Sequence, residues 1–385
     1  MGISPRASAG AWTRLADEAG PRTEGDDRPV PVLRSEAMLA AMRLVAPGRP
    51  LREGLDRILQ AGMGALMVIG DGPDVLSLCS GGFLLDAEFT PQRVSELAKM
   101  DGAIIVTGDC SRIARANVHL VPDPDIPTSE TGTRHRTAER VARQIDVPVI
   151  TVSERMSVVA IFRGGMKRAL EPVARILARS EQALQILERY KHRLDAVSGA
   201  LSALEIEDLV TVRDVAVVLQ RADMVRRIAE EIEQYVIELG DDGRLVLLQL
   251  EELMGGVEND RRLVARDYYV ESDTYEWDDV LARLSRLDTE DLLDLHEVAK
   301  ALHLPAGIDF DGALQPRGFR LLLKVPRLPE AVADHVVERF SSLQKIIRAS
   351  VPELVEVEGV GESRARAIKD GLSRLAETSI LERYV

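Results

Sequence analysis

The feature that most constrains the fold is a long run of apolar and small residues spaced alternately three and four positions apart. This spacing predicts a single long helix that packs along its whole length, less tightly where the small residues Ser180 and Ala183 fall. The members of the run are Val173, Ile176, Ser180, Ala183, Leu187, Tyr190, Leu194, Val197, Leu201 and Leu204. Helical patterns continue through 239 and recur at 245–254, 279–286 and 289–302. We therefore expect a helical spacer over 166–310 whose charged faces are solvated.

The residues before this spacer follow a different pattern, in which strands and helices alternate. Apolar runs of strand length occur at 65–69, 103–106, 147–152 and 158–162. Helical signals separate them, including the helix start at Thr90-Pro91 and another near Arg134. The alternation predicts a mixed-sheet α/β domain over 34–165, with no strand beyond Gly165. Residues 1–33 are rich in Gly, Pro, Ala and mixed charge, which is typical of a flexible leader.

Composition excludes several classes of protein. No apolar run is long enough to span a bilayer, so we expect no membrane partner. The two cysteines, Cys79 and Cys110, are interpreted as small hydrophobes of a reducing cytoplasm. A net charge of −14 argues against a chain coated in nucleic-acid-binding charge. Residues 313–348 nevertheless hold seven Lys/Arg against three Asp/Glu, so any DNA contact should be local, near 317–348.

Two short segments predict a site for a nucleotide polyphosphate. Asp101 precedes an apolar strand, and Gly102 leaves room for a flat ligand to approach the backbone. Two guanidinium groups, an imidazole and two hydroxyls stand at a predicted helix start, where free N–H groups favour an anion, in the run Thr133-Arg134-His135-Arg136-Thr137. A carboxylate and a histidine can together hold a divalent cation. Taken singly, each segment also suits a solvated cap or a turn.

Other nucleotide and metal motifs are absent from the sequence. It contains no Gly-x4-Gly-Lys-Ser/Thr loop, and its six histidines show no zinc spacing. The segments that are present resemble the signature of diadenylate cyclase domains, in the order Asp101-Gly102-Ala103, then 132–140, then Ser153-Glu154-Arg155-Met156. The stretch opening with Met166-Lys167-Arg168 and the C-terminal tail resemble the DNA integrity scanning subfamily. The resemblance covers about 35–385 and implies that two ATP molecules are condensed into cyclic di-AMP and two pyrophosphates.

The resemblance also implies a role for each residue of the site. Asp101 and His135 would hold Mg²⁺ or Mn²⁺, and Asp101 would help to activate the ribose 3′-hydroxyl. Arg134 and Arg136 would complete the catalytic set by neutralising charge or ordering the interface with a facing protomer. ATP would also contact Gly102 and Leu120 beside the adenine, Ala103 next to them, and Thr133, Thr137 and Ser153 at the phosphates.

The C-terminal segment predicts a module that holds DNA. Val357-Glu358-Gly359-Val360-Gly361 lies between two apolar helical patterns and resembles a helix-hairpin-helix motif, whose outward N–H groups suit a DNA phosphate. A degenerate copy, Val325-Pro326-Arg327-Leu328-Pro329, lacks the glycines. We expect a tandem helix-hairpin-helix domain over 311–385. Its predicted DNA contacts are Lys324, Arg327, Lys345, Gly359, Val360 and Gly361. A protein-binding or purely structural hairpin is the alternative.

Three functions fit these observations. The first is a cyclase regulated through DNA; the second is a DNA-binding scaffold whose nucleotide site senses ATP without turnover. The third is a nucleotidyltransferase that joins ATP to another acceptor. Ring closure needs two facing protomers, so a closed symmetric oligomer is expected. The resemblance implies an octamer, a preference for branched DNA such as four-way junctions, and inhibition of the cyclase when DNA is bound.

Overall fold

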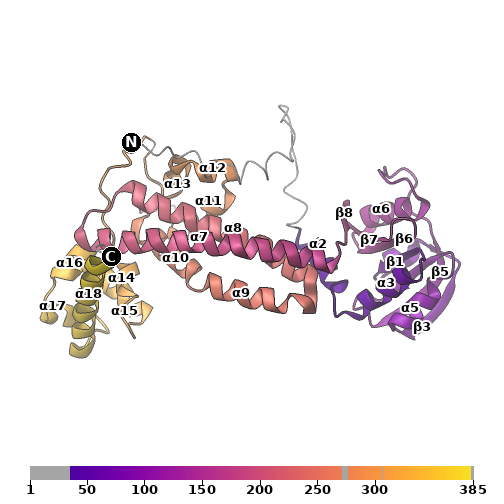
Figure 1. Cartoon of the computed structure of the whole chain (residues 1–385), viewed down its shortest axis with the longest axis horizontal. Helices are drawn as coiled ribbons and strands as arrows, with labels where there is room; N and C mark the ends of the chain where they lie inside the picture. The colour runs from indigo at the N-terminus through magenta and orange to yellow at the C-terminus, as the bar shows by residue number, and fades with distance from the viewer. Residues whose placement is uncertain (1–34, 271–275, 306, 383–385) are drawn as a thin grey trace.

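The computed structural model describes residues 35–270, 276–305 and 307–382, arranged as three parts along one long axis (Figure 1). A sheet domain lies at one end, a bundle of long helices forms the middle, and short helices gather at the other end. The expected multidomain class, mixed-sheet α/β followed by all-α parts, is confirmed. The leader predicted over 1–33 lies outside the described residues.

The sheet domain is built on one mixed sheet, with eight strands among the described residues. Its order is β2-β5-β4-β1-β6-β7-β8, and β3 pairs with β5. The central strands β1 and β4 pair in parallel and are buried at every position, because helices cover both faces of the sheet. The strands are β1 Ala65–Ile69, β2 Cys79–Ser80, β3 Phe83–Glu88, β4 Ala103–Val106, β5 Arg112–Leu120, β6 Val149–Ser153, β7 Val158–Arg163 and β8 Met166–Ala169.

Helices on the two faces of the sheet enclose two apolar clusters. One face is covered by α2 (Glu36–Leu44), α3 (Pro50–Gln60) and α5 (Pro91–Leu97), and the other by α4 (Pro73–Ser77) and α6 (Thr133–Ile145). Helix α5 starts as predicted, because the Thr90 hydroxyl accepts the Arg93 N–H at 3.2 Å. The sheet is therefore held between two packed layers, and only its edges and strand ends are open to ligands.

The expectation that strands stop at Gly165 is wrong by one short strand. β8 continues the sheet antiparallel to β7, with Met166 opposite Arg163. Its sequence, Met-Lys-Arg-Ala, carries no apolar run because β8 is an edge strand whose alternate residues are exposed. The sheet consequently ends at Ala169, and the long helix begins only at Val173.

The predicted long helix exists as α7 (Val173–Glu207) and packs against α8 (Val212–Leu239). Leu187, Leu194 and Leu201 of the predicted seam are buried between the two helices. This pair forms the spine that joins the two ends of the molecule (Figure 1). The remaining spacer elements are η2 Gly240–Gly243, α9 Arg244–Met254, α10 Val257–Tyr268, α11 Trp277–Arg286, α12 Thr289–Leu293 and α13 Leu295–Ala301.

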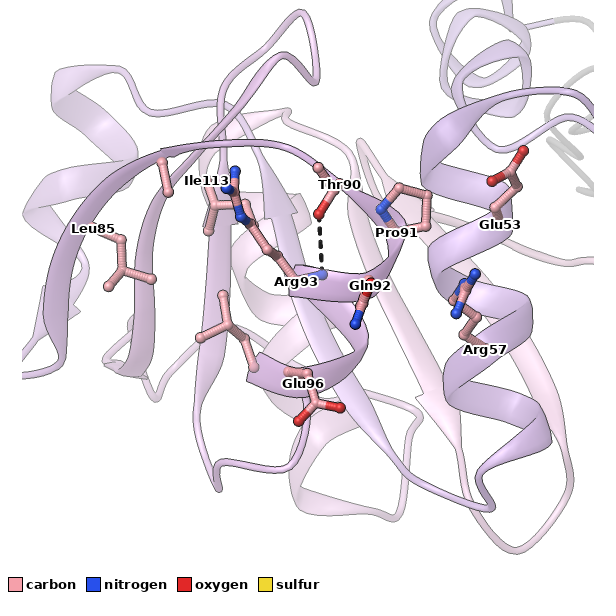
Figure 2. A pocket seen from close by; sticks show the side chains of 11 residues that line it. Glu53, Arg57, Leu85, Thr90, Pro91, Gln92, Arg93, Glu96 and Ile113 are labelled. Carbon is pink, nitrogen blue, oxygen red and sulfur yellow. Dashed lines mark hydrogen bonds between the residues drawn. The ribbon is translucent and has the colours of Figure 1, made fainter.

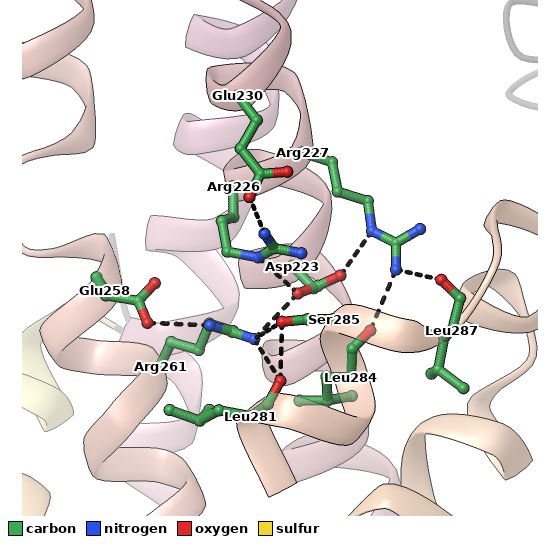
Figure 3. Close-up of polar contacts among 10 residues, drawn as sticks. All are labelled: Asp223, Arg226, Arg227, Glu230, Glu258, Arg261, Leu281, Leu284, Ser285 and Leu287. Atoms are coloured by element: carbon green, nitrogen blue, oxygen red, sulfur yellow. Dashed lines mark hydrogen bonds and ion pairs between the residues drawn. The ribbon is translucent and has the colours of Figure 1, made fainter. Parts of the chain in front are cut away.

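The expectation that the charged faces of the spacer are solvated is only partly right. Asp223 of α8 is fully buried and contacts Arg226, Arg227 and Arg261 at 2.9, 2.7 and 3.2 Å. Figure 3 shows that Arg227 also reaches the Leu287 carbonyl at the end of α11, at 2.6 Å. A buried charge cluster of this kind ties α8 to α10 and α11, because the carboxylate is stable there only while its arginine partners remain.

The C-terminal part has an apolar cluster formed mostly by residues from Phe319 onward, with Leu263 of α10 joining it from the spacer. Phe310 and Leu314, by contrast, pack against the spacer cluster. The helices of this part are α14 Phe319–Leu322, α15 Glu330–Phe340, α16 Leu343–Arg348, α17 Val351–Val355 and α18 Glu362–Glu382. Over the residues that the structure describes, none of the helices has both the length and the apolar character needed to cross a membrane.

Candidate nucleotide and DNA sites

One edge of the sheet brings together the segments that the sequence singled out. Ala65 lies opposite Val152 and Ala103 opposite Val118, so the starts of β1 and β4 meet the ends of β6 and β5 there. Asp101 and Gly102 directly precede β4, Leu120 ends β5 and Ser153 ends β6. The antiparallel register thus places residues from three distant stretches of chain along one edge.

Helix α6 starts at this edge and presents unpaired backbone donors. Its N-cap is Gly132, which provides no side-chain cap, and the first intrahelical bond runs from the Arg136 N–H to the Gly132 carbonyl at 2.8 Å. The N–H groups before Arg136 therefore point out of the helix. Thr133 and Thr137 stand one turn apart on the same face. The first turn of this described helix carries no acidic residue of its own, which suits the binding of an anion at its start.

Asp101 and Arg134 form the central contact of the candidate site. Arg134 Nη2 lies 3.3 Å from Asp101 Oδ1, although the two residues are 33 positions apart in the chain. The Asp101 side chain is 99% exposed and that of Arg134 is 41% exposed. An ion pair this open to water is weak. Arg134 can therefore leave Asp101 to bind a phosphate, and Asp101 can leave Arg134 to bind a cation, at little cost in free energy.

His135, the residue after Arg134 in α6, is held in its neutral form. Its ring meets Phe162 edge-on, with the ring centroids 6.4 Å apart. Partial burial lowers the pKa of His135; Glu130 raises it, and Lys167 and Arg134 lower it further. The net shift is downward, so the imidazole is neutral near pH 7, which is the form that binds metals.

The donors around Asp101 and His135 fit a cation that takes part of its coordination from a substrate. Among the described residues, no group of three or more His, Cys, Asp or Glu side chains forms a metal site. Mg²⁺ is commonly held by one or two carboxylates together with substrate phosphates. The exposed Asp101 carboxylate and the neutral imidazole of His135, the residue after Arg134 in α6, are protein ligands of the kind that such a pattern needs.

The other residues predicted to contact ATP differ in how exposed they are to solvent. Leu120 is only 5% exposed and Ala103 only 2%, so each offers a ligand only a small area of contact. A Cβ on Gly102 would lie 2.6 Å from the backbone of Asn117, which shows why glycine is required there. The Ser153 hydroxyl accepts a hydrogen bond from the Met156 N–H in the turn after β6, at 3.4 Å. Arg136 is exposed at the start of α6.

Glu139 anchors the loop that leads into α6, a role that the sequence did not reveal. Its Oε2 accepts the Thr128 hydroxyl at 2.5 Å and the Ser129 N–H at 3.0 Å. Burial would raise the pKa of Glu139, but these hydrogen bonds outweigh it and hold the pKa below its usual value. Lys167 of β8 contacts Glu130 at the end of the same loop, at 2.6 Å. The approach to the helix start is therefore fixed from two sides.

A cavity of about 770 Å³ lies elsewhere in the sheet domain, between α3, α5 and β3 (Figure 2). Charged residues of α3 and α5 stand around it, among them Glu53, Arg57 and Glu96, while Leu85 and Ile113 supply apolar lining. Among the described residues that line it, none belongs to the predicted nucleotide site. The nucleotide edge is an open surface by comparison.

The downstream hairpin, between α17 and α18, uses its central residue for packing. Val360 is 4% exposed, and its N–H donates to the Val357 carbonyl at 3.0 Å. The predicted contact of Val360 with DNA is therefore not available through its side chain or through its backbone N–H. Gly359 adopts a left-handed backbone, with φ of 80°, and both Gly359 and Gly361 are exposed. Gly359 and Gly361 are therefore the residues at which we still predict that a DNA phosphate approaches the backbone closely.

The upstream hairpin repeats this backbone 32 residues earlier without its glycines. Arg327 stands where Gly359 stands downstream, and it too has a left-handed backbone, with φ of 64°. The Leu328 N–H donates to the Val325 carbonyl at 3.4 Å, as Val360 does to Val357. Arg327 is exposed, as is Lys345 of α16. Lys324 instead donates to the Ser202 hydroxyl of α7 at 2.9 Å, which directs it toward the spacer.

Part of the basic excess predicted for DNA lies inside the protein. Arg320 is fully buried, with Nη1 at 2.5 Å from Glu205 Oε2 and Nη2 at 2.7 Å from the Ser198 hydroxyl, both on α7. We call this contact the Arg320–Glu205 joint. Arg317 donates to the carbonyls of Asp267 and Tyr269. Both arginines therefore fasten the C-terminal part to the spacer, and the surface near 317–348 is less basic than its composition indicates.

Comparison with known families matches each part of the chain in turn. Residues 52–167 match the DisA bacterial checkpoint controller nucleotide-binding domain, 170–310 match the DisA bacterial checkpoint controller linker region, and 342–371 match the helix-hairpin-helix motif. The upstream hairpin lies outside the last match.

Whole-chain relatives give the same result. The chain is 58% identical to the DNA integrity scanning protein DisA of Parafrankia sp. over 90% of this chain and 97% of that one. It is 56% identical to the protein of that name from Streptomyces coelicolor over 90% of this chain and 94% of the relative. It is 57% identical to the protein of that name from Kineococcus radiotolerans over 91% of this chain and 98% of the relative. The chain therefore belongs to the DisA family of DNA integrity scanning proteins, as a diadenylate cyclase with a DNA-binding helix-hairpin-helix domain.

Proposed function

We propose that this cyclase closes the cyclic di-AMP ring when two protomers face each other across the edge that carries Asp101 and the start of α6. Each protomer would hold one ATP. The 3′-oxygen of each ribose would attack the α-phosphorus of the other ATP, forming two ester bonds and releasing two pyrophosphates. The observation that carries this proposal is that Asp101 contacts Arg134 and is nevertheless 99% exposed. The proposed reacting groups would thus lie on a surface that a second protomer can cover.

Asp101 and His135 would hold Mg²⁺ or Mn²⁺ at this edge. These two residues would supply a carboxylate and an imidazole as ligands, and the cation that they hold would supply charge neutralisation at the phosphates. The neutral His135 and the exposed Asp101 carboxylate support this assignment. Asp101 would also accept the proton of the 3′-hydroxyl, which requires it to leave Arg134.

The remaining site residues would bind and orient the two nucleotides. Thr133, Thr137 and the free N–H groups at the start of α6 would bind phosphate oxygens, together with Ser153. Arg134 and Arg136 would neutralise developing charge, and the adenine would lie against Gly102 and Leu120, with Ala103 beside them. Catalysis would then rest on positioning and charge neutralisation, without a covalent enzyme intermediate.

The C-terminal hairpins would bind branched DNA such as four-way junctions. Gly359 and Gly361 would offer N–H groups to phosphates, and exposed Arg327 and Lys345 would add charge. Such contacts read the shape of DNA rather than its sequence. We infer further that bound DNA lowers cyclase activity, that facing protomers assemble into an octamer, and that the enzyme acts in the cytoplasm. The division of the chain near 33, 165 and 310 belongs to the same proposal.

The test compares Asp101→Asn with Asp71→Asn, a matched change at an exposed aspartate of the same domain. Purified proteins are incubated with ATP and Mn²⁺ or Mg²⁺, and products are identified by mass spectrometry. We expect Asp101→Asn to fold normally and to lose about 10²-fold or more of its activity, a loss typical of removing one preorganised group, while Asp71→Asn keeps wild-type turnover. Near-normal turnover by Asp101→Asn would refute the role of Asp101. Adding a four-way junction to the wild-type reaction tests the proposed inhibition.

A further inference from the structure

A buried glycine stands behind the arginine of the candidate site. Gly64 directly precedes β1 and is buried at the same sheet edge as Asp101. A Cβ placed on Gly64 would lie 2.4 Å from Nη1 of Arg134 and 3.2 Å from its Cζ. Its third neighbour would be the Val152 carbonyl oxygen, at 3.3 Å. The guanidinium therefore occupies the space that any other residue at position 64 would fill.

The backbone around Gly64 cannot yield to relieve such a clash. The next residue, Ala65, is paired with Val152 in the β1–β6 ladder, and β1 is also paired with β4 on its other side. Arg134, in contrast, approaches with the far end of a flexible side chain that is partly exposed. An added methyl group would displace the guanidinium, whereas its 3.3 Å approach to the Val152 carbonyl oxygen asks the sheet to shift by only a few tenths of an ångström.

Other glycines of the domain behave differently. A Cβ on Gly102 would meet the Asn117 backbone at 2.6 Å, so a substitution there strains the fold itself. A Cβ on Gly108, in the exposed turn after β4, would meet no atom of the described residues within 4 Å. Of the described glycines, Gly64 alone has a side chain of the predicted site within 3 Å of that position.

We propose that Gly64 is a positioning residue of the cyclase: its missing side chain provides the space in which the Arg134 guanidinium lies against Asp101. This inference rests on the proposed roles of Arg134 and Asp101. Gly64 touches no reacting atom and acts only through Arg134. A change at Gly64 should therefore reduce turnover and ATP binding without reducing stability, and its effect should vanish once Arg134 has been shortened.

The experiment uses the full chain in four forms besides wild type: Gly64→Ala, Arg134→Lys, the double variant, and Gly108→Ala as the control. Three quantities are measured: the melting temperature, the rate of cyclic di-AMP formation, and the Kd for 3′-deoxy-ATP, which lacks the attacking hydroxyl and cannot cyclise. We expect Gly64→Ala to melt within about 2 °C of wild type. Its turnover should fall, and its Kd should rise, each by about tenfold.

The double variant separates a positioning role from a structural one. If Gly64 acts through Arg134, the double variant should bind 3′-deoxy-ATP within about twofold of Arg134→Lys alone, because effects on one shared contact do not add. Full activity in Gly64→Ala, a large fall in its melting temperature, or additive losses in the double variant would each overturn the inference. An active Asp101→Asn enzyme would instead defeat the proposed function, so the two failures are distinguishable.

Discussion

Replacing Arg320 by methionine would leave a buried carboxylate without its cation at the Arg320–Glu205 joint. Arg320 and Glu205 are both fully buried, and methionine keeps most of the side-chain length without the charge. Glu205 would retain the Tyr268 hydroxyl, which donates to it at 2.9 Å. Nothing else described in the joint would carry a positive charge as close to that carboxylate.

The expected cost follows from the loss of one partner of a buried pair. Breaking a buried ion pair in this way typically costs about 3–5 kcal/mol. Glu205 can reduce the penalty by binding a proton, because burial already raises its pKa to about 7 with Arg320 in place, so the cost lies toward the lower end of that range. We therefore expect Arg320→Met to weaken the joint by about 3 kcal/mol.

Hydrogen exchange measured by mass spectrometry reports this loss locally. A change of about 3 kcal/mol in the free energy of opening should speed amide exchange about 100-fold around 198–205 and 319–323. Adding Glu205→Gln should recover at least about half of the loss, because no buried charge then remains unpaired and glutamine still accepts the Tyr268 hydroxyl. Exchange in Arg320→Met within about threefold of wild type, or no recovery in the double variant, would show that the joint is not held by this ion pair.

Further predictions concern stability, pH and salt. Leu187→Ala should destabilise the α7–α8 pair by about 2–5 kcal/mol in urea unfolding, since Leu187 is fully buried, whereas exposed Leu209→Ala should cost less than about 0.5 kcal/mol. Because the pKa of Glu205 is raised to about 7, the stability that its protonation supplies is complete below about pH 4.3 and is lost as pH rises through about 7. Glu205→Gln should therefore show a flatter dependence of exchange protection around 198–205 between about pH 5 and 8. DNA affinity should fall with salt, and Lys345→Ala should reduce the slope of log affinity against log salt by about one, as fluorescence anisotropy with a labelled junction would show.

The strands that the sequence predicted are those buried on both faces. Ala65–Ile69 and Ala103–Val106 are continuous apolar runs because helices cover both sides of the sheet. Strands β3 and β5 gave no comparable signal. β5 contains charged residues and a left-handed Asn117, and its pairing with β3 and β4 shifts register, which breaks the alternation that marks a strand. β8 also gave no signal, because it is an edge strand without an apolar run.

The candidate site was predictable only where a local motif marks it. The run from Thr133 to Thr137 concentrates guanidinium, imidazole and hydroxyl groups at a helix start, so it is visible without coordinates. Gly64 is a single glycine before a strand, and its importance depends on a side chain 70 positions away. Likewise, Arg320 and Glu205 are 115 positions apart, so composition included Arg320 in the basic excess of 313–348 although it is buried. Pairings set by tertiary packing leave no trace in local spacing.

Helix α7 has the length and the attachment points of a lever between the two ends of the enzyme. Its 35 residues span about 50 Å, and the Arg320–Glu205 joint lies near its C-terminal end. Under the proposed function, a junction bound at the hairpins would therefore lie too far away to cover the ATP edge of the same protomer. A tilt of about 10° at the joint would move the far end of the lever by about 9 Å, more than enough to separate two facing nucleotides. Inserting one residue into α7 would turn everything beyond it by about 100°, so the phase of the helix should matter as much as its length.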